Sequence, residues 1–229
     1  HASYRRQRQM CIRDRDFLKE GIDDDVLENF EKSLKKMQEQ GYEIKDISIP
    51  MIEKALAVYY ILVPAEVSSN MARYDGVKFG GRVEGKDLNE TYFKTRGELL
   101  GPEVKRRIML GTYVLSSGYA DQFYRNAWQV RNKIKDSFKS VFEDVDLIAM
   151  PVTPTPAFKI GEKSSDPLQM YLIDIFTVVA NVVGIPAVSI PSGNVEREEK
   201  ELPVGFQLLA PHLHEKRLFE AGKKFEKIK

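Results

Sequence analysis

The chain has 229 residues and a formal net charge of +1, from 35 Lys and Arg against 34 Asp and Glu, which excludes polyanion binding by bulk positive charge. The hydrophobic fraction of 42% excludes a disordered chain, and no apolar run approaches the roughly 18 residues of a spanning helix, so no membrane partner is expected. The single Cys11 excludes an internal disulfide, and with no secretory signal a cytoplasmic location is expected.

Residues 1–15 differ in composition from the rest of the chain. They are rich in arginine, show neither a helical nor an alternating period, and give way to patterned sequence at Asp16. The string RQRQMCIRDR is similar to translated sequencing-adaptor DNA, so we interpret residues 1–15 as a non-native arm and expect no function for Cys11. A basic arm for nucleic acid or an acidic partner is the alternative.

From Asp16 onward, helical and strand patterns alternate. Asp23, Asp24 and Asp25 suit a helix N-cap and first turn, and apolar residues at helical spacing continue that helix toward Gly41. Further helices are expected at residues 52–72, 103–118, 121–142, 167–183 and from 215 to the C-terminus. Strands are expected at residues 42–50, 147–153, 187–193 and 203–210. Strands separated by helices predict a layered α/β fold.

The sequence lacks the usual phosphate-binding and metal-binding motifs. Neither the Walker pattern nor the dinucleotide fingerprint occurs, which argues against nucleotide binding. His212 and His214 flank Leu213 in a polar segment without further clustered ligands, which favours a solvated turn, and no metal site is expected. The paired serines have no histidine placed as a base and no GxSxG elbow, so they identify no catalytic residue.

One arginine stands on the apolar side of an expected helix. A helical projection of EVKRRIMLGTYVLSSG places Arg107 on the same face as Gly111 and Leu115. Arg106 points to the opposite side. Arg107 is therefore expected to face inward and to have a partner, because an unpaired buried charge is costly and arginine does not lose its proton.

Residues 167–183 are apolar nearly all round, which is typical of a buried helix. Asp174, Thr177 and Asn181 form one polar stripe on it, at positions i, i+3 and i+7. Structural ion pairs are one interpretation of Arg107 and Asp174. The other is that the two residues hold a zwitterionic amino acid, since a guanidinium binds an α-carboxylate bidentately and an aspartate binds an α-ammonium.

Five longer stretches carry a family resemblance: AEVSSNMARYDGVKFGGR, EVKRRIMLGTYVLSSGYAD, MPVTPTPAFKIGEKSSDPLQMYLIDIFT, NVVGIPAVSIPSG and LPVGFQLLAP. In order and spacing they resemble the C-terminal half of the A subunits of glutamyl-tRNA(Gln) amidotransferases, a branch of the amidase signature family. The resemblance extends from Phe17 to Ile228. The strings RRIMLGT and DPLQMY indicate the tRNA-dependent branch, whereas NxxGxPAxSxPxG is shared with other amidases.

The resemblance implies a fold, an activity and partners. Residues 16–229 would form the C-terminal part of an amidase signature domain, with a mixed twisted sheet covered by helices on both faces. The implied activity is hydrolysis of glutamine, which supplies ammonia for converting Glu-tRNA(Gln) to Gln-tRNA(Gln). Subunits B and C complete a heterotrimer, and the misacylated tRNA binds mainly through the partner subunit. ATP and magnesium are expected on that partner, and no cofactor is expected on this chain.

The resemblance also implies site residues. The family's Ser, cis-Ser and Lys triad lies in a Gly/Ser-rich signature that this sequence does not contain, so no catalytic residue carries over and the chain is expected to be inactive alone. Arg107 in VKRR resembles the arginine that binds the α-carboxylate, and Asp174 in MYLID resembles the aspartate that binds the α-ammonium. Tyr59 in AVYYIL resembles a substrate-contacting tyrosine, with Tyr60 or a core aromatic role as alternatives.

Two other functions stay open on the sequence. One is a different amidase of the same family that acts on a small neutral amide, although Arg107 and Asp174 would then lack compensating charges. The other is an amino-acid-binding or interaction module without turnover. Removal of the rest of the fold would expose sheet edge and apolar surface, so low solubility of the isolated chain is expected.

Overall fold

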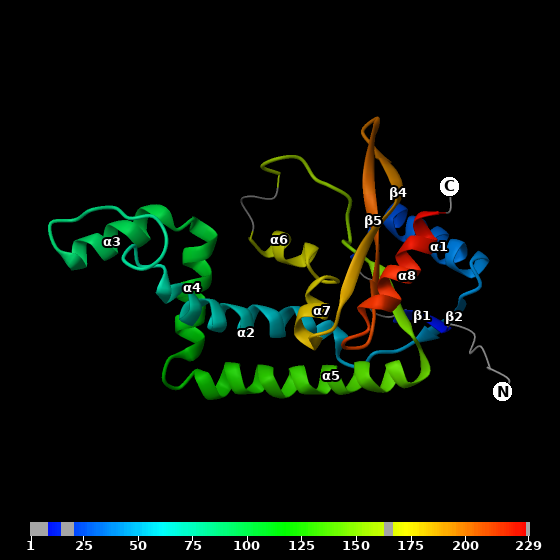
Figure 1. Ribbon diagram of the computed structural model, residues 1–229, viewed down its shortest axis with the longest axis horizontal. Coiled ribbons are helices and arrows are strands. Elements are labelled where there is room, and N and C mark those ends of the chain that lie inside the picture. The colour runs from blue at the N-terminus through cyan, green and yellow to red at the C-terminus, as the bar shows by residue number, and fades with distance from the viewer. Residues whose placement is uncertain (1–8, 15–20, 163–166, 228–229) are drawn as a thin grey trace. The chain divides into compact units, whose positions relative to one another are not determined.

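The computed structural model describes residues 9–14, 21–162 and 167–227, with side chains for residues 21–162 and 170–227. The chain forms two compact units, whose elements are labelled in Figure 1. The sheet unit consists of residues 1–56 and 131–229, and the helical unit consists of residues 57–130.

Within the described residues, the sheet unit is built on a mixed five-stranded sheet with the order β2-β1-β3-β5-β4. Its strands are β1 (Gln9–Asp14), β2 (Glu43–Ile47), β3 (Leu147–Pro151), β4 (Ala187–Arg197) and β5 (Lys200–Leu209). β1 pairs in parallel with β2 and β3, whereas β5 pairs antiparallel with β3 and β4. The four expected strands are confirmed, and β1 is an addition to them.

β1 lies within the segment interpreted as a non-native arm. Its backbone pairs with both neighbours although its residues show no alternating hydrophobic pattern. Backbone N–H and C=O groups form a ladder whatever the side chains are, so this pairing does not depend on such a pattern. The boundary expected between residues 15 and 16 lies outside the described residues, and the non-native origin of the arm stays a prediction.

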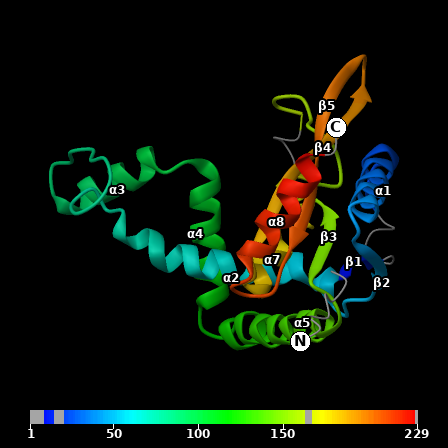
Figure 2. The ribbon, with the colours of Figure 1, turned by 45° about the vertical axis from the view of Figure 1, so that its right-hand side comes forward.

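Helices α1 (Asp24–Glu39) and α8 (Glu215–Glu226) cover one face of the sheet (Figure 2). They meet at Phe206 of β5, which is completely buried. The Phe206 ring centroid lies 5.7 Å from that of Phe30 on α1 and 5.0 Å from that of Phe225 on α8. Successive side chains of a strand point to opposite faces, so the next residue, Gln207, belongs to the other face.

The opposite face is covered by α7 (Val178–Val183), which is also tied to α5 (Asn126–Asp144). Gln207 Nε2 donates to the Phe176 carbonyl at 3.2 Å, just before α7 begins. Arg131 Nε of α5 donates to the Val182 carbonyl at 2.7 Å. Helices thus lie on both faces of a mixed sheet, which confirms the α/β fold that the resemblance implied.

The expected start of α1 is confirmed, but its acidic residues have a different role. Asp23 is the N-cap without a side-chain capping bond. The Asp23 and Asp25 carboxylates instead bind Arg197 near the tip of the β4–β5 hairpin, at 2.8 and 2.6 Å from Nη2. The two-residue turn at that tip, Glu198 and Glu199, has φ values of +46° and +62°.

The helical unit contains α2 (Ala55–Asn70), α3 (Leu88–Leu99) and α4 (Pro102–Leu115), followed by a π-helical turn at Ala120–Arg125 that leads into α5. α3 was not among the expected helices. Its buried positions are Thr91 and Thr95, while Phe93 is 82% exposed, so no apolar period marks it. Its start is marked instead by Asp87, whose carboxylate accepts from the Glu90 N–H at 2.8 Å.

The prediction of one helix over residues 167–183 is wrong. The structure has α6 (Pro167–Ile173) and α7 (Val178–Val183), with a turn over residues 174–177. Phe176 in this turn is 1% exposed, and its carbonyl is held by Gln207 of the sheet. β-Branched residues are frequent around the turn and form weak helices, so this tertiary contact outweighs the helical pattern.

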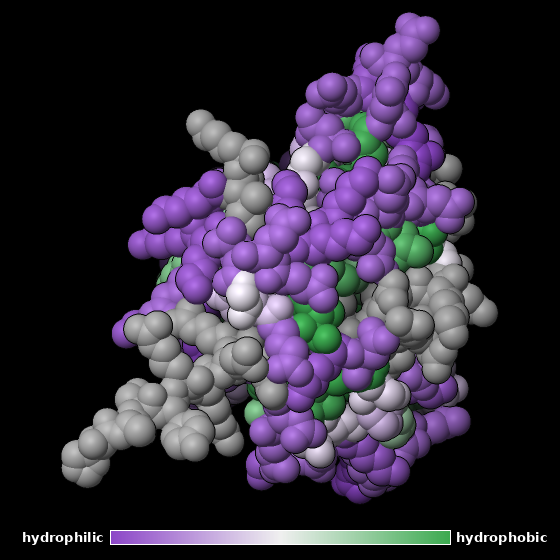
Figure 3. All heavy atoms as spheres, turned by 90° about the vertical axis from the view of Figure 1, so that its right-hand side faces the viewer, coloured by the Kyte–Doolittle hydropathy of each residue, from purple (hydrophilic) through white to green (hydrophobic). Residues whose placement is uncertain are grey.

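The face that carries α1 is largely hydrophilic, with hydrophobic side chains visible in the narrow spaces between polar ones (Figure 3). In the part of the chain that the structure describes, no helix combines the length and apolar character needed to cross a membrane.

Candidate functional site

The helical unit brings α2 and α4 into close contact at Gly111. A Cβ atom at Gly111 would lie 1.9 Å from the Pro64 carbonyl oxygen and 2.8 Å from Ser68 Cβ. Only glycine therefore allows the two backbones to approach this closely. Arg107 lies one helical turn before Gly111, so the crossing sets it against the preceding turn of α2.

Three side chains surround the Arg107 guanidinium. Its Nε atom lies 2.9 Å from Glu103 Oε1 on the same helix, and it also donates to the Tyr59 hydroxyl on α2. Its Cζ atom lies 5.6 Å from the centre of the Tyr60 ring, in a cation–π contact. The Arg107 side chain is 25% exposed against 50% for Arg106. The prediction that Arg107 faces inward and has a partner is confirmed.

Both charges of this cluster are stable at neutral pH. Burial lowers the pKa of Arg107, but hydrogen bonds to Glu103 and Tyr59 outweigh burial and raise it above its ordinary value. Burial raises the pKa of Glu103, but its bonds to Arg107 and Arg106 outweigh burial and lower it. A guanidinium has five N–H donors, so the contacts with Glu103 and Tyr59 leave donors for a ligand carboxylate.

The structure brings together two of the sequence-predicted residues or their alternatives. Tyr59 and Tyr60 both contact Arg107, with their own ring centroids 5.2 Å apart, so both interpretations of the tyrosine fit the geometry. Glu103 was missed by the sequence analysis. Its signal was the spacing of four residues between a glutamate and Arg107 on one helix, which favours an ion pair.

Asp174 lies in the sheet unit, in the half-buried turn between α6 and α7. Its carbonyl accepts from the Thr177 hydroxyl at 3.1 Å, and the Thr177 carbonyl accepts from Asn181 Nδ2 at 3.2 Å. The polar stripe on one continuous helix is therefore wrong, because the helix is interrupted at Asp174. Tyr59 and Arg107 belong to the helical unit, and a joint role of these two with Asp174 stays a prediction.

The two histidines near the C-terminus form a local turn. His214 Nδ1 lies 2.9 Å from the His212 carbonyl oxygen, and both side chains are exposed, which confirms the predicted solvated turn. Among the described residues, no group of three or more His, Cys, Asp or Glu side chains is placed to hold a metal ion.

Relatives of the chain share one printed name. The chain is 50% identical over 212 residues to the A subunit of glutamyl-tRNA(Gln) amidotransferase from Thermodesulfovibrio yellowstonii. It is 47% identical over 209 residues to the protein of the same name from Pseudomonas putida. These matches cover 93% and 91% of this chain but only 43% and 42% of the two relatives. The chain therefore spans less than half the length of the curated relatives it matches.

Solved structures agree with these relatives. The crystal structure of the A subunit of glutamyl-tRNA(Gln) amidotransferase from Thermotoga maritima matches with a TM-score of 0.65 and 35% identity, over 95% of this chain and 40% of that one. A crystal structure of an amidase matches with a TM-score of 0.70 over 96% of this chain and 45% of that one, and its 21% identity supports the fold alone. The family model described as amidase matches residues 6–219, nearly the whole sequence. The chain belongs to the amidase family.

Proposed function

We propose that the chain is the C-terminal part of an A subunit of a tRNA-dependent amidotransferase, where it binds glutamine for hydrolysis to glutamate and ammonia. The observation that carries this proposal is Arg107, an inward guanidinium with donors left over, beside two tyrosines on α2. The name that the relatives share supports the same reaction.

Each end of the amino acid has a matching group in this proposal. The Arg107 guanidinium binds the α-carboxylate, because a planar fork of N–H donors matches two carboxylate oxygens. Glu103 fixes the guanidinium from the other side through its Nε bond. Tyr59 or Tyr60 packs against the substrate, and Asp174 accepts from the α-ammonium.

Turnover requires groups beyond those described for this chain. The sequence contains no Gly/Ser-rich catalytic signature, so the proposal assigns the nucleophile to the rest of the full-length protein. Subunits B and C complete the enzyme in the cytoplasm. The ammonia then converts Glu-tRNA(Gln) to Gln-tRNA(Gln) on the partner subunit, which binds the misacylated tRNA, ATP and magnesium.

A chimeric protein tests this function. Residues 16–229 replace the matching part of the Thermodesulfovibrio yellowstonii relative, and glutamine-dependent ammonia release is measured with the partner subunits present. We expect turnover, with Arg107→Ala raising KM for glutamine about 100-fold through loss of charge-assisted hydrogen bonds. Asp174→Asn should raise KM about tenfold on the same reasoning.

Arg106→Ala is the matched control, since Arg106 is the exposed neighbour on the same helix. It should leave KM within about twofold of the parent. A folded chimera that releases ammonia from small neutral amides such as propionamide but not from glutamine would favour the other amidase function. Equal KM values for the Arg107 and Arg106 variants would remove Arg107 from the site.

A further inference from the structure

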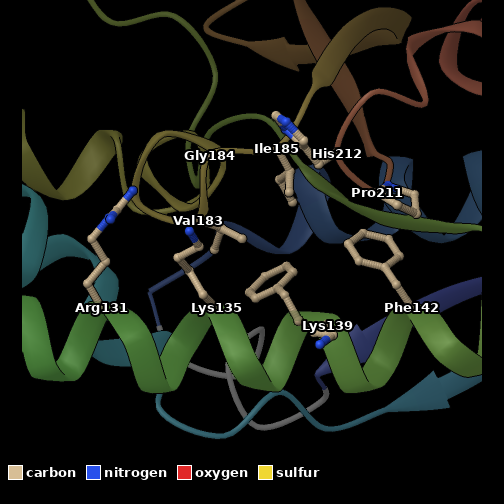
Figure 4. Close-up of a pocket in the computed structure, with 10 residues that line it drawn as sticks. Arg131, Lys135, Lys139, Phe142, Val183, Gly184, Ile185, Pro211 and His212 are labelled. Carbon is tan, nitrogen blue, oxygen red and sulfur yellow. The ribbon is translucent and has the colours of Figure 1, made fainter.

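A pocket of about 480 Å³ lies in the sheet unit beside α5 (Figure 4), and we name it the α5 pocket. Side chains of α5 form one wall, and the other walls come from the turn between α7 and β4 and from the segment after β5. The volume lies within the range of small-molecule sites. None of the residues of the proposed glutamine site, Tyr59, Arg107 and Asp174, lines this pocket.

The interior of the α5 pocket is apolar. Phe138 and Phe142 are one helical turn apart on α5, with ring centroids 6.3 Å apart. Both face the pocket together with Val183, Ile185 and Pro211 from the other walls. An apolar body of a ligand would therefore be removed from water against these side chains.

Cationic side chains lie around this apolar interior. Arg131, Lys135 and Lys139 follow one another at four-residue intervals along α5, about 6 Å of helix per step. His212 stands on the opposite wall, and none of the lining residues is acidic.

The cations differ in how firmly they are held. Arg131 Nε is fixed by its bond to the Val182 carbonyl at 2.7 Å. Lys135 and Lys139 are exposed and make no ion pair with any residue that the structure describes. Two unneutralised ammonium groups at the edge of an apolar pocket attract an anion more strongly than exposed, neutralised charges do.

We infer that the α5 pocket binds a small organic anion with an aromatic or aliphatic body, and that a phosphate monoester suits it better than a carboxylate. The body packs against Phe138 and Phe142, and the anionic group lies among Lys135, Lys139 and Arg131. A phosphate carries nearly two charges and three acceptor oxygens, which matches several donors better than one carboxylate does. This inference does not rest on the proposed glutamine hydrolysis.

Calorimetric titration of the 229-residue chain with three probes tests the inference. The probes share a naphthalene body and are 1-naphthyl phosphate, 1-naphthoate and neutral 1-naphthalenemethanol. We expect the phosphate to bind tightest, the carboxylate about tenfold more weakly, and the alcohol weakest. The double variant Lys135→Ala, Lys139→Ala should lower phosphate affinity about 100-fold, since each charge-assisted bond contributes about tenfold.

Two further variants separate the charges from the cavity. Lys133→Ala removes an exposed lysine of α5 that does not line the pocket, and it should change affinity less than about twofold. Ile185→Trp fills the pocket and keeps the lysines, so it should abolish binding in a sample whose circular dichroism matches the parent.

Three results would overturn the inference. The first is equal binding of the alcohol and the phosphate, and the second is an equal effect of the Lys133 variant and the double variant. The third comes from repeating the titration on the full-length chimera. Binding confined to the 229-residue chain would mean that the rest of the protein fills the α5 pocket.

Discussion

At the scale of single residues, the ion pair between Glu103 and Arg107 ties the stability of α4 to pH. Pairing with Arg107 and Arg106 outweighs burial and holds the pKa of Glu103 below its ordinary value of 4.5. The carboxylate therefore stabilises the folded chain above pH 4.5, and this stabilisation is lost as the pH falls through the lower folded pKa.

Glu103→Gln should therefore reduce the loss of stability in acid. The difference from the parent at neutral pH should be about 0.5 kcal/mol, the usual size for a partly exposed pair within one helix, and it should shrink below pH 4.5. Thermal unfolding in buffers from about pH 3 to about pH 7 measures it. Glu98→Gln, at an exposed position of α3, is the control, and parallel pH profiles for parent and Glu103→Gln would contradict the prediction.

Gly111 makes a second prediction at this scale. Gly111→Ala places a Cβ atom 1.9 Å from the Pro64 carbonyl oxygen, so α2 and α4 must separate. We expect destabilisation of about 3 kcal/mol, measured by urea unfolding. Gly97→Ala is the matched control, because a Cβ atom at Gly97 in α3 meets nothing within 4 Å. It should be neutral or stabilise by up to about 1 kcal/mol, and similar losses for both variants would disprove the close contact.

At the scale of secondary-structure elements, the β4–β5 hairpin turns through two residues that suit the turn poorly. Glu198 and Glu199 have φ values of +46° and +62°, where Asn and Gly are favoured. The double variant Glu198→Asn, Glu199→Gly should stabilise the chain by about 1 kcal/mol, read as a higher melting temperature. Glu199→Ala keeps the strained backbone and removes only the charge, so it should give no such gain.

Sequence patterns predicted the elements that bury an apolar face or cap in an ordinary way. The strands and α1 follow this rule, since β5 alternates between its two faces at Phe206 and Gln207. α3 escaped because its buried side chains are threonines. The break between α6 and α7 escaped because it depends on Gln207, more than 30 residues away, and no local pattern carries that information.

The candidate site was predictable to a similar extent. Helical projection found the inward Arg107, and the resemblance supplied Tyr59 and Asp174. The same projection placed Leu115 inside, yet Leu115 is 42% exposed and Val114 is 4% exposed. The projection assumes an ideal angle of 100° per residue, and α4 ends at Leu115, where neighbouring structure decides which side is covered.

At the scale of the whole molecule, the chain presents features that promote association. β2 and β4 are the edge strands of the sheet in the described residues. In the helical unit, Phe93 and Met109 are 82% and 73% exposed. Unpaired strand edges and large exposed apolar side chains are sites of self-association.

We expect the 229-residue chain to associate as its concentration rises, measured by sedimentation velocity. The double variant Phe93→Ser, Met109→Ser should lower the associated fraction severalfold, because it removes apolar surface without touching the core. Lys94→Ser, on the same helix as Phe93, is the control. A parent chain that stays monomeric at about 0.1 mM would contradict the expectation, as would equal effects of the two variants.

The hydrogen bond from Gln207 to the Phe176 carbonyl has a consequence for the evolution of the chain. Asp174 lies two residues before Phe176, so a residue of the central sheet acts as the anchor from which this carboxylate is hung. Replacing Gln207 by an apolar residue would keep the sheet filled and release the turn. Drift at position 207 would thus retune the proposed α-ammonium site, although that position never touches a substrate.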